Sequence, residues 1–126
     1  MEKSVIATKN APAAIGPYSQ GIKANGMVFT SGQLPINPAT GNMDASDIEG
    51  QTHQAIKNLE AVLKEAGSDL SKVVKTTVFL SDLGNFGKVN EIYATYFKSE
   101  APARSCFEVS KLPKAALIEI EAIAVI

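Results

Sequence analysis

The sequence is poor in the residues from which disulfides and metal sites are built. Its 126 residues include one cysteine, one histidine and no tryptophan. A single cysteine cannot form an internal disulfide, and together with one histidine it cannot supply the four ligands of a structural zinc site. The composition therefore predicts a protein without a disulfide framework and without a metal centre.

An excess of positive charge and long apolar runs are also missing. Twelve Lys and Arg against thirteen Asp and Glu give a net charge of −1, and aromatic residues make up 6%. Such a chain lacks the basic field that neutralises a phosphate backbone and has few rings on which bases could stack. The longest apolar run, residues 122–126, is too short to cross a membrane, and the N-terminus has no apolar stretch of a signal peptide. We therefore expect a cytoplasmic protein that binds neither nucleic acid nor membranes.

What is present is the composition of an ordinary folded domain. Hydrophobic residues make up 45% of the chain and charged residues 20%. A chain of about 130 residues buries roughly two-thirds of its unfolded surface, which is enough for one core but leaves no room for a second. We expect a single domain over residues 1–126.

Turn residues divide the first third of the chain. Asn25-Gly26 lies between two short apolar-bearing runs within residues 20–31, a spacing typical of a tight β-hairpin. A short strand around residues 4–7 is expected before the hairpin. Residues 32–42 are rich in Gly and Pro, which predicts an ordered loop without regular structure.

Two amphipathic helices are expected after this loop. Ser46 and Glu49 have the spacing of a capping box, and apolar residues then recur every three or four positions until Gly67, which has the place of a C′ residue. The second helix has its apolar positions within residues 86–97. Pro102 follows beyond its end, as expected for a helix stop.

Three further strands complete the predicted fold. Residues 73–80 are rich in β-branched residues, and residues 103–109 and 117–125 alternate in polarity. The resulting order is β-β-β-α-β-α-β-β. This order predicts an α+β fold with one mixed sheet and both helices on a single face.

The last two strands carry an unusual set of charges. Period-two alternation places Glu119 and Glu121 on the same side as apolar residues, and carboxylates on a partly buried surface need partners. Arg104 is the candidate partner because its guanidinium can hold a carboxylate through two hydrogen bonds and would lower its pKa. Two interpretations remain open from the residues alone: a structural ion pair between strands, or a ligand site.

Other candidate residues each allow a structural and a functional interpretation. Cys106 is either a small packing residue or a nucleophile, although no neighbouring histidine would activate it. His53 lies off the apolar stripe of its helix, as expected for a surface histidine rather than a catalytic base. Tyr18 either packs its ring or lines a pocket. Ser31 and Gly32 form either a plain turn or a point of close backbone approach to a ligand.

Six segments in this order resemble the RidA family, also called YjgF/YER057c/UK114. The segments are APAAIGPYSQG at 11–21, TSGQLPINPATG at 30–41, VVKTTVFLSDL at 73–83, Phe86 with VNEIY at 89–93, PARSCFEVSKLPK at 102–114 and IEIEAIA at 118–124. The resemblance covers nearly the whole chain. It implies a chorismate-mutase-like α+β fold and a homotrimer with a central barrel and ligand sites between subunits.

The resemblance also implies an activity. Members of this family hydrolyse 2-iminobutanoate and 2-iminopropanoate, which arise from pyridoxal-phosphate-dependent Ser/Thr dehydratases, to 2-keto acids and ammonia without a metal or cofactor. Arg104 would hold the carboxylate of the substrate, and Glu119 would position or activate the attacking water. The other implied substrate-binding residues are Tyr18 from the neighbouring subunit, Ser31, Gly32, Asn90 and Cys106.

Three other functions are compatible with the same resemblance. A non-catalytic sensor could use Arg104 to bind 2-keto acids or amino acids. Endoribonuclease activity has been attributed to the family under the name L-PSP, but the absence of a basic patch and of an activating histidine argues against it. For a chaperone-like or translation-inhibiting role the sequence offers no specific residue.

Overall fold

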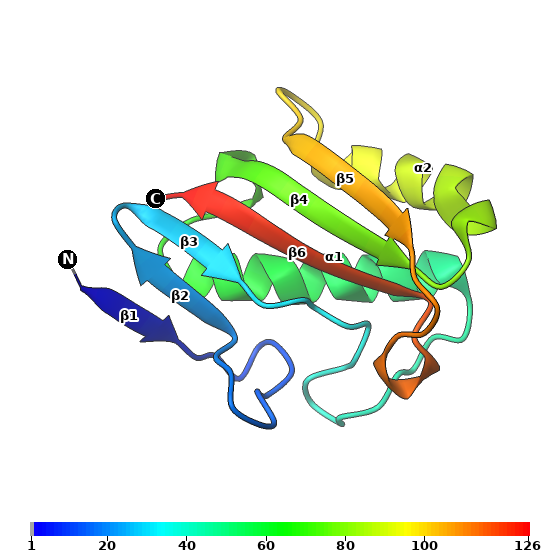
Figure 1. The fold of residues 1–126 in the computed structure, drawn as a ribbon, viewed down its shortest axis with the longest axis horizontal. Helices are drawn as coiled ribbons and strands as arrows, with labels where there is room; N and C mark the ends of the chain where they lie inside the picture. The colour runs from blue at the N-terminus through cyan, green and yellow to red at the C-terminus, as the bar shows by residue number, and fades with distance from the viewer. Residues whose placement is uncertain (1) are drawn as a thin grey trace.

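A computed structural model describes residues 2–126 and contains six strands and two helices (Figure 1). Three 3₁₀ turns lie at residues 70–72, 83–85 and 113–115. The order of the main elements is the one predicted from the sequence. Along the chain they are β1 (Lys3–Ile6), β2 (Gly21–Ala24), β3 (Met27–Thr30), α1 (Ile48–Glu65), β4 (Val73–Leu80), α2 (Phe86–Tyr96), β5 (Ala103–Glu108) and β6 (Ile118–Val125).

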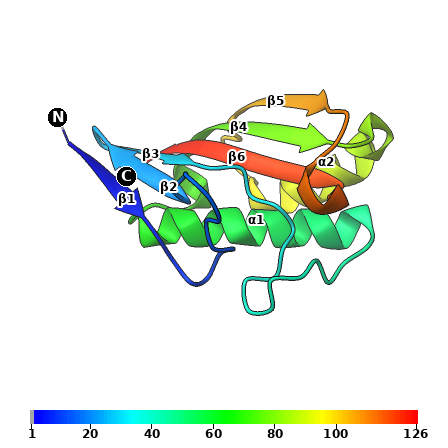
Figure 2. The ribbon, with the colours of Figure 1, turned by 60° about the horizontal axis from the view of Figure 1, so that its bottom comes forward.

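The strands form one mixed sheet in the order β1-β2-β3-β6-β4-β5. All neighbours are antiparallel except β4 and β5, which are parallel and are joined through α2, as a parallel pair requires a crossover. Both helices lie on the same side of the sheet (Figure 2). The predicted α+β architecture is confirmed. Within residues 2–126, no helix is long and apolar enough to span a membrane.

The core lies between the sheet and the helices. On β6, Ile118 and Ile120 are 1% exposed and face the helices, whereas Glu119 and Glu121 alternate with them on the other face and are half-buried. The predicted period-two alternation of this strand is therefore confirmed. No helix among the described residues covers the face that carries the two glutamates, so this face is called the open face below.

The predicted hairpin connects β2 and β3. Asn25 and Gly26 both have positive φ angles, 52° and 74°. Two successive positive φ angles characterise the type I′ turn, whose twist matches that of the strands. Asn-Gly is favoured there because asparagine tolerates and glycine readily adopts this conformation.

Helix α1 begins one residue later than the capping box predicted. Asp47, not Ser46, is the N-cap, and its carboxylate accepts a hydrogen bond from the Gly50 N–H at 3.0 Å. Aspartate caps as well as serine does, so the two adjacent candidates could not be separated by spacing alone. The predicted C-terminus is confirmed, because Gly67 has φ 86° and the Ser68 N–H bonds the Leu63 carbonyl at 2.9 Å, as in a Schellman motif.

Two buried amide side chains on α1 hold the loops beside the sheet. Asn58, 1% exposed, donates to the carbonyls of Leu34 and Ile36 at 2.9 and 2.8 Å. The Gln51 side chain, 3% exposed, accepts from the Leu117 N–H at 2.8 Å. Buried polar groups are stable when bonded in this way, so these loops are fixed by specific contacts rather than by apolar packing alone.

The loop before β6 contains backbone strain that a single substitution should relieve. Lys114 and Ala115 have successive φ angles of 59° and 56°, a conformation that costs a residue with a Cβ roughly 1–2 kcal/mol. We expect Ala115→Gly to raise the free energy of unfolding by about 0.5–1 kcal/mol after the greater unfolded-state entropy of glycine is subtracted. Urea denaturation with an unchanged m-value measures this gain.

Ala101 is a matched control for this substitution. It is exposed and does not have a positive φ, so Ala101→Gly should leave stability unchanged or lower it. Equal effects of the two substitutions would show that the strain at Ala115 is not a significant cost to the fold.

Candidate functional site

The predicted site residues lie in two groups on opposite faces of the sheet. Strand β4 lies between β6 and β5, so the residues that it pairs with in each strand show which residues of β5 and β6 share a face of the sheet. Phe79 is level with Glu119 of β6 and Phe107 of β5, on the open face. Thr76, which is fully buried toward α2, is level with Arg104. Arg104 therefore faces the helices and Glu119 faces away from them.

The expected ion pair between Arg104 and Glu119 is thus not formed within one chain. Among residues 2–126 the only ion pairs are Lys64–Glu60 and Lys88–Glu49, both at the surface and 3.8–3.9 Å long. The prediction of a lowered pKa for Glu119 is also wrong. Burial raises the pKa of the Glu119 carboxyl above its ordinary value, and the charge of Glu121 raises it further.

Glu119 lines a cavity of about 670 Å³ next to the loop that follows β3. Tyr18, Ser31 and Gly32 line the same cavity, so the structure brings four of the predicted site residues together. The rest of its wall is mostly apolar and consists of Pro12, Ala13, Ile15, Leu34, Ile36, Pro38 and Pro113. Gln20, Gln33, Gly41 and Lys114 complete it. This mixture of an apolar wall and a few polar groups is typical of a small-molecule site.

Gly32 lies directly against the Glu119 side chain. A Cβ atom at position 32 would come within 2.7 Å of the Glu119 Cδ and 3.0 Å of its Cγ. Backbone bonds between Gln33 and Ile120, at 2.7 and 3.1 Å, hold this loop alongside β6. Glycine is therefore required at position 32 for the carboxylate to keep its place, which explains the close backbone approach that the sequence left open.

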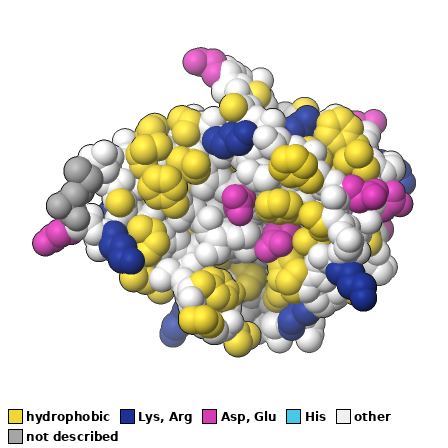
Figure 3. Space-filling view, in the orientation of Figure 1, with side chains coloured by type: hydrophobic (Ala, Val, Ile, Leu, Met, Phe, Trp, Pro, Cys, Tyr) yellow, Lys and Arg dark blue, Asp and Glu magenta, His cyan; other side chains and the backbone are white. Residues whose placement is uncertain are grey.

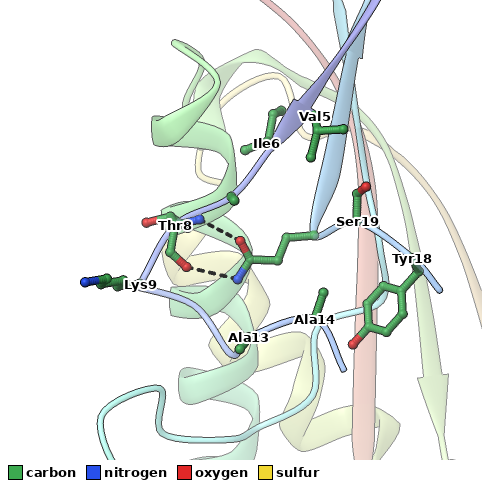
Figure 4. Close-up of a pocket in the computed structure, with 10 residues that line it drawn as sticks. Val5, Ile6, Thr8, Lys9, Ala13, Ala14, Tyr18 and Ser19 are labelled. Atoms are coloured by element: carbon green, nitrogen blue, oxygen red, sulfur yellow. Dashed lines mark hydrogen bonds between the residues drawn. The ribbon is translucent and has the colours of Figure 1, made fainter. Parts of the chain in front are cut away.

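The buried side chain of Gln20 holds the segment that carries Tyr18 through hydrogen bonds to residues 8–12. This role was not predicted from the sequence. Its amide donates to the carbonyls of Thr8 and Pro12 at 3.0 and 2.7 Å and accepts from the Thr8 N–H at 2.6 Å. Two of these bonds are visible on Thr8 in Figure 4. Gln20 lies outside any periodic segment, so no sequence pattern indicated its burial.

Tyr18 and Ser31 differ in how free their side chains are. The Tyr18 side chain is 53% exposed and also borders a neighbouring hollow of about 440 Å³, between β1 and residues 13–20, that is drawn in Figure 4. The Ser31 hydroxyl donates to the carbonyl of Ser19, and its N–H bonds the Gln20 carbonyl at 2.9 Å. Ser31 therefore holds the two loops together, while the Tyr18 ring is available for contact.

Arg104, Asn90 and Cys106 form the second group, between β5 and α2. The Arg104 Nη1 donates to the Asn90 Oδ1 at 2.7 Å. Its guanidinium carbon lies 5.2 Å from the centre of the Phe86 ring and 4.8 Å from that of Tyr93. All these partners are neutral, so they hold the guanidinium without neutralising its charge.

Arg104 borders two hollows on this side of the sheet. One, of about 540 Å³, is shared with Leu83, Phe86 and Cys106, and the other, of about 490 Å³, is lined by residues of α2 and the segment before β5. Burial raises the pKa of the Cys106 thiol, and the nearby Arg104 only partly opposes this rise. A protonated thiol is a poor nucleophile, which favours the packing interpretation of Cys106.

The remaining candidates lie elsewhere. His53 is exposed on α1, and its Nδ1 lies 2.8 Å from the Tyr96 hydroxyl, away from both groups of site residues. This position agrees with the predicted surface histidine. Over residues 2–126 the structure contains no cluster of three or more His, Cys, Asp or Glu side chains that could hold a metal ion.

Comparison with solved structures identifies the structural class of the protein. A crystal structure of a conserved Rid-family protein from Yersinia pestis is 58% identical and superimposes with a TM-score of 0.97, covering 99% of this chain and 100% of that chain. The structure of Escherichia coli TdcF with bound serine is 44% identical, with a TM-score of 0.93 and 98% of both chains covered. This is the fold of a small α+β protein whose relative binds an amino acid.

The sequence comparisons then show the family. The model of the family described as endoribonuclease L-PSP matches residues 8–126. The 2-iminobutanoate/2-iminopropanoate deaminase of Escherichia coli is 51% identical over 123 residues, which cover 95% of both chains. The chain belongs to the RidA (YjgF/YER057c/UK114) family, as its motifs indicated.

Proposed function

We propose that this protein is a 2-iminobutanoate/2-iminopropanoate deaminase, a hydrolase that converts 2-imino acids to 2-keto acids and ammonia. The observation that carries the proposal is the guanidinium of Arg104, which borders open space and has only neutral partners. An arginine held in this way is ready to bind a carboxylate through two hydrogen bonds. The 51% identity with a relative of that name supports the choice of substrate.

The reaction needs a fixed substrate and a positioned water. Arg104 binds the carboxylate of the imino acid, and water attacks the C=N carbon to form a carbinolamine. Glu119 accepts a proton from the water and returns it to the nitrogen. The hydroxyl proton then passes through Glu119 to the amino nitrogen, the C–N bond breaks so that ammonia leaves, and the hydroxyl oxygen becomes the keto oxygen. Substrate binding is thus assigned to Arg104 and proton transfer to Glu119.

The surroundings of Glu119 support its role as the base. A raised pKa makes a carboxylate a stronger proton acceptor once it is ionised. The close contact with Gly32 restricts the positions that the carboxylate can adopt. Tyr18 lines the same cavity and offers its exposed ring for contact with the substrate.

We propose that the complete site forms between two copies in a homotrimer with a central barrel. Arg104 and Glu119 lie on opposite faces of one sheet, so a substrate can contact both only if they come from different copies. The open face supports such an assembly because Phe29 and Phe107 are 41% and 53% exposed on it. Figure 3 shows apolar patches on this face with acidic side chains between them. Large exposed apolar areas of this kind mark interfaces.

The primary test follows 2-oxobutanoate formation from 2-iminobutanoate generated in situ by a threonine dehydratase. The purified protein should accelerate its release above the spontaneous rate. Binding of 2-oxobutanoate without acceleration would support a sensor instead. Cleavage of RNA that survives loss of imine hydrolysis would support the endoribonuclease alternative.

Mixing two inactive variants tests the shared site. Arg104→Ala and Glu119→Gln should each lower activity by about a hundredfold or more, but trimers refolded from an equal mixture should recover about a quarter of the wild-type activity, because random assembly pairs an intact Arg104 with an intact Glu119 at about one site in four. Each variant refolded alone is the control. No recovery in mixed trimers, verified by mass spectrometry, would place both residues in the same half of the site.

A further inference from the structure

We propose that Tyr93 is a positioning residue that fixes the guanidinium of Arg104 for the carboxylate of the ligand. The inference rests on the proposed function for the identity of that ligand. It concerns a residue of α2 that contacts Arg104 on the side of the sheet facing the helices. Its basis is a chain of contacts from the core to the guanidinium.

The first contact is between the Tyr93 ring and Arg104. The guanidinium carbon lies 4.8 Å from the ring centre, closer than its 5.2 Å distance to Phe86. A cation over an aromatic face is attracted by the ring quadrupole, and the attraction grows where water is excluded. Tyr93 is 6% exposed, so its ring provides a partly dry and rigid support for the charge.

The second contact fixes the ring itself. The Tyr93 hydroxyl lies 2.8 Å from the Thr76 Oγ1, and Thr76 is completely buried in β4. The Phe97 ring packs on Tyr93 with a centroid distance of 4.5 Å. The ring therefore cannot move without leaving a buried hydroxyl unpaired, which is costly.

The two contacts meet at the same register position of the sheet. Thr76 and Arg104 are direct partners across β4 and β5, and Tyr93 spans both from α2. The guanidinium thus lies against the Tyr93 ring, whose hydroxyl is bonded to Thr76 of the sheet, and its Nη1 donates to the Asn90 Oδ1. A long arginine side chain loses much rotamer freedom on binding, and this arrangement removes that freedom before the ligand arrives.

The test compares three substitutions. Tyr93→Leu should raise KM for 2-iminobutanoate by about two- to thirtyfold, the range that one cation–π contact covers, with a smaller change in kcat. Tyr93→Phe keeps the ring and should stay within about fivefold of wild type. Tyr96→Leu, on the same helix with its hydroxyl bonded to His53, is the matched control and should leave KM unchanged.

A spectroscopic readout separates positioning from general destabilisation. In ¹⁵N spectra, the Arg104 Nε–H should be shifted by the Tyr93 ring current in wild type and in Tyr93→Phe. It should move toward its random-coil position in Tyr93→Leu and remain in place in Tyr96→Leu. If Tyr93→Leu does not fold, Tyr93→Phe and Thr76→Val, alone and combined, carry the test. Because both remove the same hydrogen bond, their effects on KM should be strongly non-additive.

Two results would overturn the inference. One is an Arg104 resonance and a KM that do not respond to Tyr93→Leu, and the other is simple additivity of Thr76→Val and Tyr93→Phe. If instead Arg104→Ala leaves imine hydrolysis unchanged, Arg104 is not the carboxylate-binding group. The proposed function itself fails if the wild-type protein does not accelerate imine hydrolysis. The ¹⁵N spectra would still decide whether Tyr93 positions the guanidinium.

Discussion

Replacing Arg104 with alanine should lower kcat/KM for 2-iminobutanoate by about 10² to 10³-fold, the loss expected when one partner of a hydrogen-bonded charge pair is removed. The loss should be large because the other groups around the guanidinium, Asn90, Phe86 and Tyr93, carry no charge and cannot bind a carboxylate in its place. Steady-state kinetics with imine generated by a dehydratase measure this effect.

Arg104→Lys is the matched control for charge. Lysine keeps the positive charge but cannot form the two parallel hydrogen bonds of a guanidinium, so its activity should lie between wild type and Arg104→Ala. Neither variant should unfold the protein, because Arg104 makes no ion pair among the described residues. Full activity in Arg104→Ala would exclude this residue as the carboxylate-binding group.

Glu119→Gln should lower kcat by about 10² to 10⁴-fold, the usual contribution of a general base, with little change in KM. The substitution keeps the shape of the side chain beside Gly32 and removes only its ability to accept a proton. The native carboxyl has a raised pKa, so its protonated form is the one that folding favours. The neutral amide should therefore not destabilise the protein, and a thermal melt checks this.

The dependence of kcat/KM on pH should identify Glu119 as the titrating group. Only the ionised carboxylate accepts a proton, so wild-type kcat/KM should rise with pH through the raised pKa of Glu119 and then level off. Glu121→Gln removes the like charge that contributes to the raised pKa and should shift this rise to lower pH. A rise that does not move in Glu121→Gln would assign the titration to another group.

The sequence was sufficient for most of the fold because its local signals agree with one another. Asn25-Gly26 defined the hairpin, the stripe of α1 defined its length, and the alternation around Glu119 defined the two faces of β6. Each of these signals depends on residues close together in the chain. The ends of β1, β5 and β6 differ from the predicted ends by one residue, and the shift from Ser46 to Asp47 at the start of α1 concerns two adjacent residues that are both good N-caps.

The relation between the two halves of the site could not be read from the sequence. Alternation shows which residues of one strand share a face, but only the register across β4 shows that Arg104 and Glu119 have opposite faces. The pKa of Glu119 was predicted with the wrong sign for the same reason, because its assumed partner lies on the other side of the sheet.

The buried amides were also missed, although two of them left a signal. Gln51 and Asn58 stand within the apolar stripe of α1, three residues after Ile48 and Ala55. An amide in such a stripe indicates a buried hydrogen-bond donor, because an unbonded one would destabilise the core. Gln20 left no comparable pattern, since its partners Thr8 and Pro12 come from an irregular segment.

The position of β5 at the edge of the sheet links ligand binding to local unfolding. Within residues 2–126 this strand pairs with β4 alone, and α2 connects the two. Edge strands open more readily than central ones, and such an opening would separate Arg104 from Asn90. A ligand held by the closed form resists that opening by mass action. Occupancy of the site and protection of the β5 amides against hydrogen exchange therefore rise together.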